Sequence, residues 1–258
     1  LDQLARKTAR TVSLANQGAF QATVFGLAGD VVLASGSDIL NDKGQILSNG
    51  EIAMTAAGSI VNQTAQPGPG ELQVTTTQRR RPLLAFFLPL RSRHHLTYQG
   101  VDPGGEQVAI ITALKGIALQ AGGLIVNNGG QINANGGILS LTAAGVENRS
   151  VALGAMDLTL SCGRICTSTG GSTLTFAEGL LRTSGDLQIL ADDRFANQGG
   201  EVLALGKVAI TADSVTTSAL RDPLLVTRPG GLYNFWRGTT AWIALRDRLG
   251  EIIAQAGD

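Results

Sequence analysis

The sequence predicts an all-β fold, a parallel β-helix in which short strands wind into stacked rungs of about 20 residues. Three observations predict it. Two different sequence phrases recur with one common spacing, all seven prolines fall in two segments, and the 258 residues include 34 glycines but only 4% aromatics. Small inward side chains suit the narrow interior of such a coil, and glycine suits its tight turns.

The first phrase alternates apolar with small or polar residues after a glycine, as in 185–191. Such alternation places one set of side chains inside and the other outside. The units are too short, and too rich in Gly, Asn, Ser and Thr, for helices. The first apolar positions of the copies are Val31, Ile52, Ile117, Leu139, Leu158, Leu187 and Val208.

The second phrase is an asparagine that follows an apolar or small residue. Asn41 and Asn62 are 21 residues apart, and Asn127 and Asn148 are again 21 apart. The alternative fold is an antiparallel sandwich or barrel, and a sandwich gives no reason for this recurrence. We therefore expect a structural ladder of stacked asparagines, formed by Asn16, Asn41, Asn62, Asn127, Asn148 and Asn197.

Two insertions interrupt the single β-helix segment predicted for 1–258, at 64–105 and at 218–250. They contain all seven prolines, both tryptophans, both tyrosines and both histidines. Since proline cannot donate to a β ladder, its confinement there supports a continuous coil elsewhere. The first insertion is expected to be a β-hairpin with a basic and aromatic tip. In the second, 240–256 could be a strand or an amphipathic helix, and the repeat resumes near Ile252. The remaining coil amounts to about eight rungs, or ~40 Å. The chain starts within the pattern and is expected to be part of a longer protein.

The first insertion also holds the one local charge anomaly, five arginines with no acidic residue between Leu72 and Val101. Such a surface could bind an anionic glycan, a lipid headgroup or a partner protein, or it could be a solvated protrusion. The aromatic cluster of the second insertion could pack as a cap or contact a sugar. The candidate partner-contact residues are Arg79, Arg80, Arg81, Phe86, Phe87, Arg91, Arg93, His94, His95, Tyr98, Tyr233 and Trp236.

Composition limits the other functions. Lys plus Arg and Asp plus Glu number 20 each, so the neutral chain does not have the basic charge of a nucleic-acid binder. No apolar run approaches the ~20 residues of a membrane-spanning helix. The adjacent His94 and His95 lack further metal ligands, and no cofactor is expected. Asp157 and Asp186 occupy the same slot of their phrases and could form a catalytic pair, but carboxylates that cap turns are favoured.

Cys162 and Cys166 are the only cysteines. A secreted protein tends to pair its cysteines. In an extended chain they would lie ~13 Å apart, too far for a disulfide. A disulfide is favoured over two free thiols if Gly163 permits a turn between them.

The repeated phrases resemble those of a known family. The phrase Gly185-Asp186-Leu187-Gln188-Ile189-Leu190-Ala191, followed by 196–200 (Ala-Asn-Gln-Gly-Gly), is similar to the repeats of filamentous haemagglutinin. Those repeats occur in exoproteins of bacterial two-partner secretion, including the contact-dependent growth-inhibition proteins. The resemblance covers the chain outside the two insertions. The Asn-Pro-Asn-Gly motif of the family's amino-terminal secretion domain is absent from the sequence.

The resemblance implies a right-handed β-helix, exported by an outer-membrane transporter and secreted to the cell surface of a Gram-negative bacterium, where such proteins act in adhesion and virulence. The expected function is a non-catalytic, structural and adhesive rod segment of an adhesin or toxin stalk. One alternative is a receptor-binding segment that contacts a host or target-cell receptor or glycan through the insertions. A less favoured alternative is a carbohydrate-active enzyme.

Overall fold

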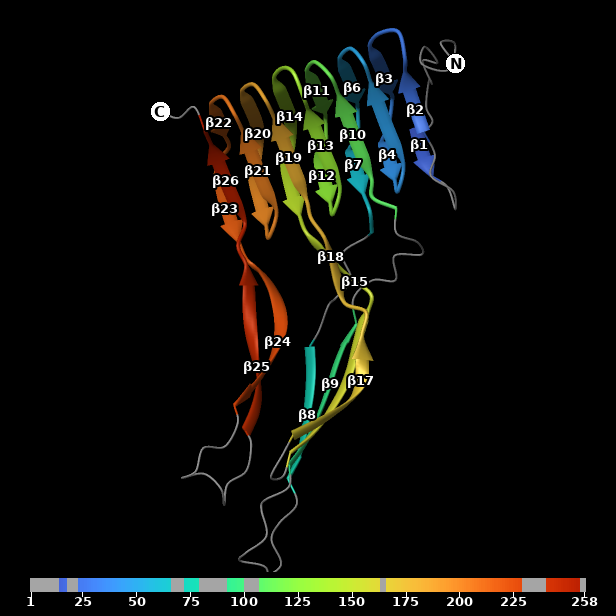
Figure 1. Cartoon of the computed structure of the whole chain (residues 1–258). Helices are drawn as coiled ribbons and strands as arrows, with labels where there is room; N and C mark the ends of the chain where they lie inside the picture. The colour runs from blue at the N-terminus through green and yellow to red at the C-terminus, as the bar shows by residue number, and fades with distance from the viewer. Residues whose placement is uncertain are drawn as a thin grey trace, which may run out of the picture.

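The computed structural model describes residues 14–17, 23–65, 72–78, 92–99, 107–162, 166–228 and 240–255. These residues form strands and no helix. Most strands lie in long parallel sheets, stacked side by side in Figure 1, and antiparallel hairpins project from one side of that stack. The structure thus confirms an all-β architecture of stacked parallel strands.

The stack consists of three rows of strands. The first row contains β3 (Val31–Ser35), β6 (Ile52–Ala56), β11 (Ile117–Ala121), the first part of β14 (Leu139–Arg149), the first part of β20 (Leu187–Gln198) and β22 (Val208–Thr211). The second row contains β1 (Leu14–Gln17), β4 (Ile39–Asp42), β7 (Ile60–Gln63), β12 (Leu124–Asn128), the ends of β14 and β20, and β23 (Ser214–Ser218). The third row contains β2 (Thr23–Gly26), β5 (Gln45–Ser48), β10 (Ile110–Ala113), β13 (Gln131–Ala134), β19 (Leu180–Thr183), β21 (Glu201–Ala204) and β26 (Glu251–Ala254).

The chain contributes strands to the three rows in a fixed order, and each strand pairs with the neighbouring strand of its own row. Val31 lies opposite Ile52, and Ile125 lies opposite Val146, each a separation of 21 residues in parallel register. Because β14 and β20 run through both of the first two rows, these rows form one 11-stranded sheet, and the third row forms a 7-stranded sheet.

Alternating residues of all three rows meet in one apolar core. In the first row Ile52, Ile117 and Leu139 stack in register and are almost fully buried. Ile111, Ile132 and Leu181 form the matching column of the third row. Burial of a Leu or Ile side chain contributes about 1.5–3 kcal/mol, and these columns repeat it in every layer.

Three segments leave the stack as antiparallel hairpins. Four strands pair in the order β17-β16-β9-β8, and smaller pairs form between β15 and β18 and between β24 and β25. β25 is a strand, which decides between strand and helix for that segment, and β26 rejoins the stack in parallel with β21, as the sequence predicted. The hairpin strands are β8 (Leu72–Gln78), β9 (Ser92–Gln99), β15 (Val151–Leu153), β16 (Ala155–Cys162), β17 (Cys166–Ser172), β18 (Thr175–Ala177), β24 (Leu220–Arg228) and β25 (Thr240–Arg248).

One of these projecting segments corrects the sequence analysis. The phrase around Leu158 was assigned to the coil, but β16 pairs antiparallel with β9 and β17. Leu139 is instead paired directly with Leu187, across 48 residues. Alternation with a period of two looks the same in either kind of sheet, so the phrase alone could not separate them. Among the described residues, the third row contains seven strands.

Candidate functional site

The three projecting segments leave the stack at the same corner, between a second-row strand and the next third-row strand. The first lies between β7 and β10, the second between β14 and β19, and the third between β23 and β26. Figure 1 shows the hairpins gathered on that side of the stack. This corner and the hairpins that it carries form the candidate functional site.

A ladder of asparagine side chains runs along the inside of this corner. The Nδ2 of each asparagine donates to the Oδ1 of the next, at 2.7 Å from Asn41 to Asn62, 2.8 Å to Asn127, 2.8 Å to Asn148 and 3.0 Å to Asn197. All five side chains are at most 1% exposed. Asn16 lies opposite Asn41 in the backbone register. A buried amide is stable only with its hydrogen bonds made, and stacking meets that need.

The same side chains also close the corner. In uninterrupted layers Nδ2 donates to the carbonyl three residues later, at 2.8 Å from Asn127 to Gly130 and 2.9 Å from Asn197 to Gly200. Asn148 instead reaches Gly179, at 2.9 Å, beyond the whole second hairpin. The bond from the asparagine side chain to the carbonyl at the start of the next row is therefore retained, although a projecting segment of 30 residues separates Asn148 from Gly179.

A backbone difference separates the interrupted corners from the others. Two residues after the asparagine, the uninterrupted corners place Lys43, Gly129 or Gly199, with φ between 56° and 60°. This left-handed conformation turns the chain back at once and favours glycine. The corners before the first and second projecting segments place Thr64 and Ser150 there instead, and the third, where Thr217 lies opposite Asn197, places Ala219 there.

Those two hydroxyls hold the ends of each hairpin together. Thr64 Oγ1 donates to the Gly129 carbonyl at 2.5 Å and accepts from the Ala109 N–H at 3.1 Å. Ser150 Oγ donates to the Gly199 carbonyl at 2.5 Å and accepts from the Gly179 N–H at 3.3 Å. Both sites read Asn-x-Ser/Thr, a pattern that otherwise marks glycosylated surface loops. Here both asparagines are buried, so the pattern has a structural role.

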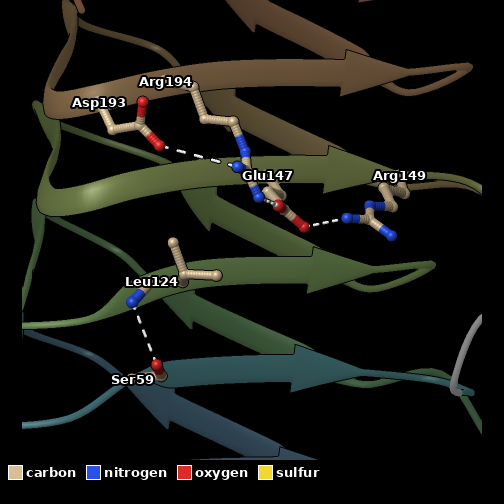
Figure 2. Close-up of polar contacts among 6 residues, drawn as sticks. All are labelled: Ser59, Leu124, Glu147, Arg149, Asp193 and Arg194. Carbon is tan, nitrogen blue, oxygen red and sulfur yellow. Dashed lines mark hydrogen bonds and ion pairs between the residues drawn. The ribbon is translucent and has the colours of Figure 1, made fainter.

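A buried carboxylate lies on the outer face of the same corner. Glu147 is 5% exposed and lies between Arg149 and Arg194, with which it forms ion pairs (Figure 2). The Arg194 contact measures 2.5 Å, and Asp193 lies 3.7 Å from the same guanidinium. The hydrogen bond to Glu147, and then its charge, raise the pKa of Arg194 above its ordinary value. Both arginines thus neutralise a carboxylate beside the second hairpin.

Figure 2 also shows a second type of contact between layers, in which a side chain caps a backbone N–H of the next layer. Ser59 Oγ accepts from the Leu124 N–H at 3.0 Å. Asp186 Oδ1 accepts from the Lys207 N–H at 2.9 Å, so Asp186 caps a turn, as the sequence analysis favoured. Asp157 lies in β16 of the projecting sheet, so these two aspartates do not share a slot, contrary to the sequence analysis.

The projecting four-stranded sheet has two unlike faces. Arg93, His95 and Thr97 alternate along β9 on one face, opposite Ser161, Thr159 and Asp157 of β16. His95 Nδ1 lies 3.0 Å from Thr159 Oγ1 and 3.7 Å from Asp157 Oδ1; the His95 and Asp157 side chains are exposed and Thr159 is half-buried. On the other face Met156 is buried, and it packs with Ala152, Leu158, Leu174 and Phe176. The hairpins thus present a polar, solvent-exposed surface.

The predicted contact residues are only partly described. Arg93, His94, His95 and Tyr98 lie in β9, with Arg93 and His95 exposed. Arg79, Arg80, Arg81, Phe86, Phe87, Arg91, Tyr233 and Trp236 lie outside the described residues. The sequence analysis missed the second hairpin, Thr64 and Ser150. The signal that could have found them was a hydroxyl residue where other corners have glycine or lysine.

Cys162 and Cys166 are opposite each other in the register of β16 and β17. Opposite residues of an antiparallel pair have Cα atoms about 4.5–5.5 Å apart, within the range that a disulfide requires. The antiparallel pairing thus brings the two cysteines within the distance that a disulfide requires, and the disulfide stays a prediction.

Within the described ranges, no three His, Cys, Asp or Glu residues gather as a metal site would need. The same residues contain no helix long and apolar enough to cross a bilayer. Comparison with known proteins finds no matching family model, no matching curated protein and no matching solved structure.

Proposed function

We propose that this chain is a segment of a right-handed parallel β-helix that serves as a non-catalytic, structural and adhesive rod in a large secreted surface protein. In this proposal an outer-membrane transporter of a Gram-negative bacterium exports the parent protein, and the segment holds distal binding or toxin elements away from the cell. The resemblance to haemagglutinin repeats motivates the route of export and the location.

One observation carries the proposal: the parallel register with a separation of about 21 residues in uninterrupted layers, with buried asparagines stacked along it. Each layer of such a winding chain bonds to the next by three backbone ladders and an amide bridge. Layers about 4.8 Å apart resist separation along the whole length. The physical product of this arrangement is stiffness, which a stalk requires.

Single-molecule pulling on the two ends of the chain tests this mechanical role. A coil that unwinds by layers releases 21 residues at a time in uninterrupted layers, or ~7 nm of extended chain. We expect repeated force peaks with that increment. A single peak that releases the whole stack at once would refute unwinding by layers, and with it the layer-by-layer mechanical resistance that the proposal assumes.

Receptor binding through the hairpins is the second candidate. The observation that favours it is the gathering of all three hairpins at one corner, with Arg93, His95 and Asp157 exposed on one face. The matched variant replaces Thr64–Ala109 with Gly-Gly, which recreates the corner at 127–130. Labelled wild-type chain and this variant are compared for saturable binding to target cells. Loss of binding in a variant that keeps its β-sheet circular dichroism supports this candidate, and equal binding by both chains excludes the first hairpin.

A further inference from the structure

The projecting four-stranded sheet has one unprotected edge. In the order β17-β16-β9-β8, the outer strands are β17 and β8, and β8 pairs only with β9 among the described strands. Among the described strands, the N–H and C=O groups on the far side of β8 therefore form a row without a partner. Such a row is a template for another strand, and proteins normally protect it with Pro, Gly, charges or short length.

The other edges of the hairpins carry those protections. β17 contains Gly170, with φ of 105°, followed by Gly171, and glycine within a strand weakens it. In the remaining hairpins β24 contains Pro223, β25 ends in 246–248 (Arg-Asp-Arg), and β15 and β18 have three residues each. β8 reads Leu-Gln-Val-Thr-Thr-Thr-Gln, seven residues without Pro, Gly or charge.

We infer that β8 is a strand-addition site and that its occupant is β8 of a second copy of this chain, paired antiparallel about a two-fold axis at Thr75. In this register Thr75 faces Thr75, Val74 faces Thr76, Gln73 faces Thr77 and Leu72 faces Gln78. Threonine and β-branched pairs across antiparallel strands are favourable, and no like charges meet.

The same register joins the two sheets edge to edge and places their equivalent faces on the same side. Gln73, Thr75 and Thr77 belong to the face of His95 and Thr159, and each pairs with a residue of that same face in the other copy. The result is one eight-stranded sheet whose polar face is continuous. A closed two-fold contact of this kind stops at the dimer and does not propagate.

Charge and geometry favour the antiparallel arrangement over a parallel one. In the sequence β8 is preceded by Glu71 and followed by Arg79, so antiparallel pairing brings unlike flanks together and parallel pairing brings like ones. The Leu72 end of β8 is the end nearest the stack (Figure 1). Two copies joined about Thr75 therefore carry their stacks at opposite ends of the joint sheet, where they do not collide.

Sedimentation equilibrium of the whole 258-residue chain over a hundredfold concentration range tests the dimer. Thr75→Lys places two ammonium groups against each other at the axis, and we expect it to weaken dimerisation at least tenfold. Thr75→Val keeps the branched, uncharged strand and should dimerise as wild type does. Thr169→Lys makes the same change on β17, the protected edge, and should also leave the dimer intact.

Two results would overturn the inference. One is a wild-type chain that stays monomeric throughout, and the other is Thr75→Lys with unchanged dimerisation and unchanged circular dichroism. A cross-link gives an independent reading in a background where Cys162 and Cys166 are serine. Thr75→Cys should form a disulfide-linked dimer on mild oxidation, because residues opposite each other at the axis are within disulfide range. Equal cross-linking by Thr169→Cys would exclude the two-fold at Thr75. None of these results depends on the proposed rod function.

Discussion

Replacing Asn148 with alanine removes the centre of the asparagine ladder. Asn148 Nδ2 donates to the Gly179 carbonyl at 2.9 Å and to Asn197 Oδ1 at 3.0 Å, and its side chain is fully buried. The variant leaves Asn197 Oδ1 without this donor and Asn127 Nδ2 without the Asn148 acceptor, whereas the Gly179 carbonyl keeps the Glu201 N–H at 2.9 Å. Asn127, the neighbour on the other side, keeps its own bond to the Gly130 carbonyl at 2.8 Å.

The expected cost follows from the two amide contacts of the ladder that are broken, one to Asn197 and one from Asn127. A buried polar group that loses its partner costs about 1–3 kcal/mol, so Asn148→Ala should lower the free energy of unfolding by about 3 kcal/mol. Asn49→Ala is the matched control. Asn49 also donates to a backbone carbonyl, that of Leu27 at 2.8 Å, but it is exposed, and water replaces the lost bond. The control should cost about 0.5–1 kcal/mol.

Urea unfolding followed by circular dichroism measures both variants against the wild-type chain. The buried variant should unfold at a clearly lower urea concentration than the exposed one. If Asn148→Ala destabilises the protein no more than Asn49→Ala does, the buried ladder does not stabilise the stack, and the reasoning fails.

Three further predictions follow from single features of the structure. Gly206→Ala should destabilise the protein by about 1–3 kcal/mol, because the new Cβ would lie 2.8 Å from the backbone of the adjacent layer. Gly171→Ala is its control: the new Cβ meets nothing within 4 Å, and the variant should cost less than about 0.5 kcal/mol in the same urea titration. Replacing 64–109 with Gly-Gly should leave a folded stack with a cooperative urea transition, and an unfolded product would show that the corner contacts do not suffice to close it. Thiol titration of the oxidised, denatured chain should find no free thiol, whereas two reactive groups would exclude the disulfide of Cys162 and Cys166.

The parts of the fold that could be predicted from the sequence are those whose residues recur with the layer spacing. The 21-residue spacing of Asn41 and Asn62 predicted their stacking, because one position inside a wound chain must satisfy the same hydrogen bonds in every layer. The carboxylate of Asp186 was predicted as a turn cap, and it caps the backbone N–H 21 residues later. Side-chain hydrogen bonds that repeat in each layer can therefore be predicted from the sequence.

The second hairpin was not predicted, for an equally physical reason. Alternation in β16 specifies a strand with two unlike faces, but it does not specify which neighbour the strand pairs with. The information was in the corner that precedes it, where Ser150 stands in place of a glycine. The faces of the projecting sheet also escaped prediction, because they follow from pairing between segments that are 60 or more residues apart in sequence, such as His95 and Thr159.

Nuclear Overhauser effects between backbone protons test the central claim most directly, namely that parallel ladders between successive layers of one chain hold the protein together. In a 15N- and 13C-labelled sample that keeps its Hα protons, we expect contacts of the parallel type from Ile117 to both Ile52 and Leu139. Strong Hα–Hα contacts between strands of 110–149, which are typical of antiparallel pairs, would contradict the account.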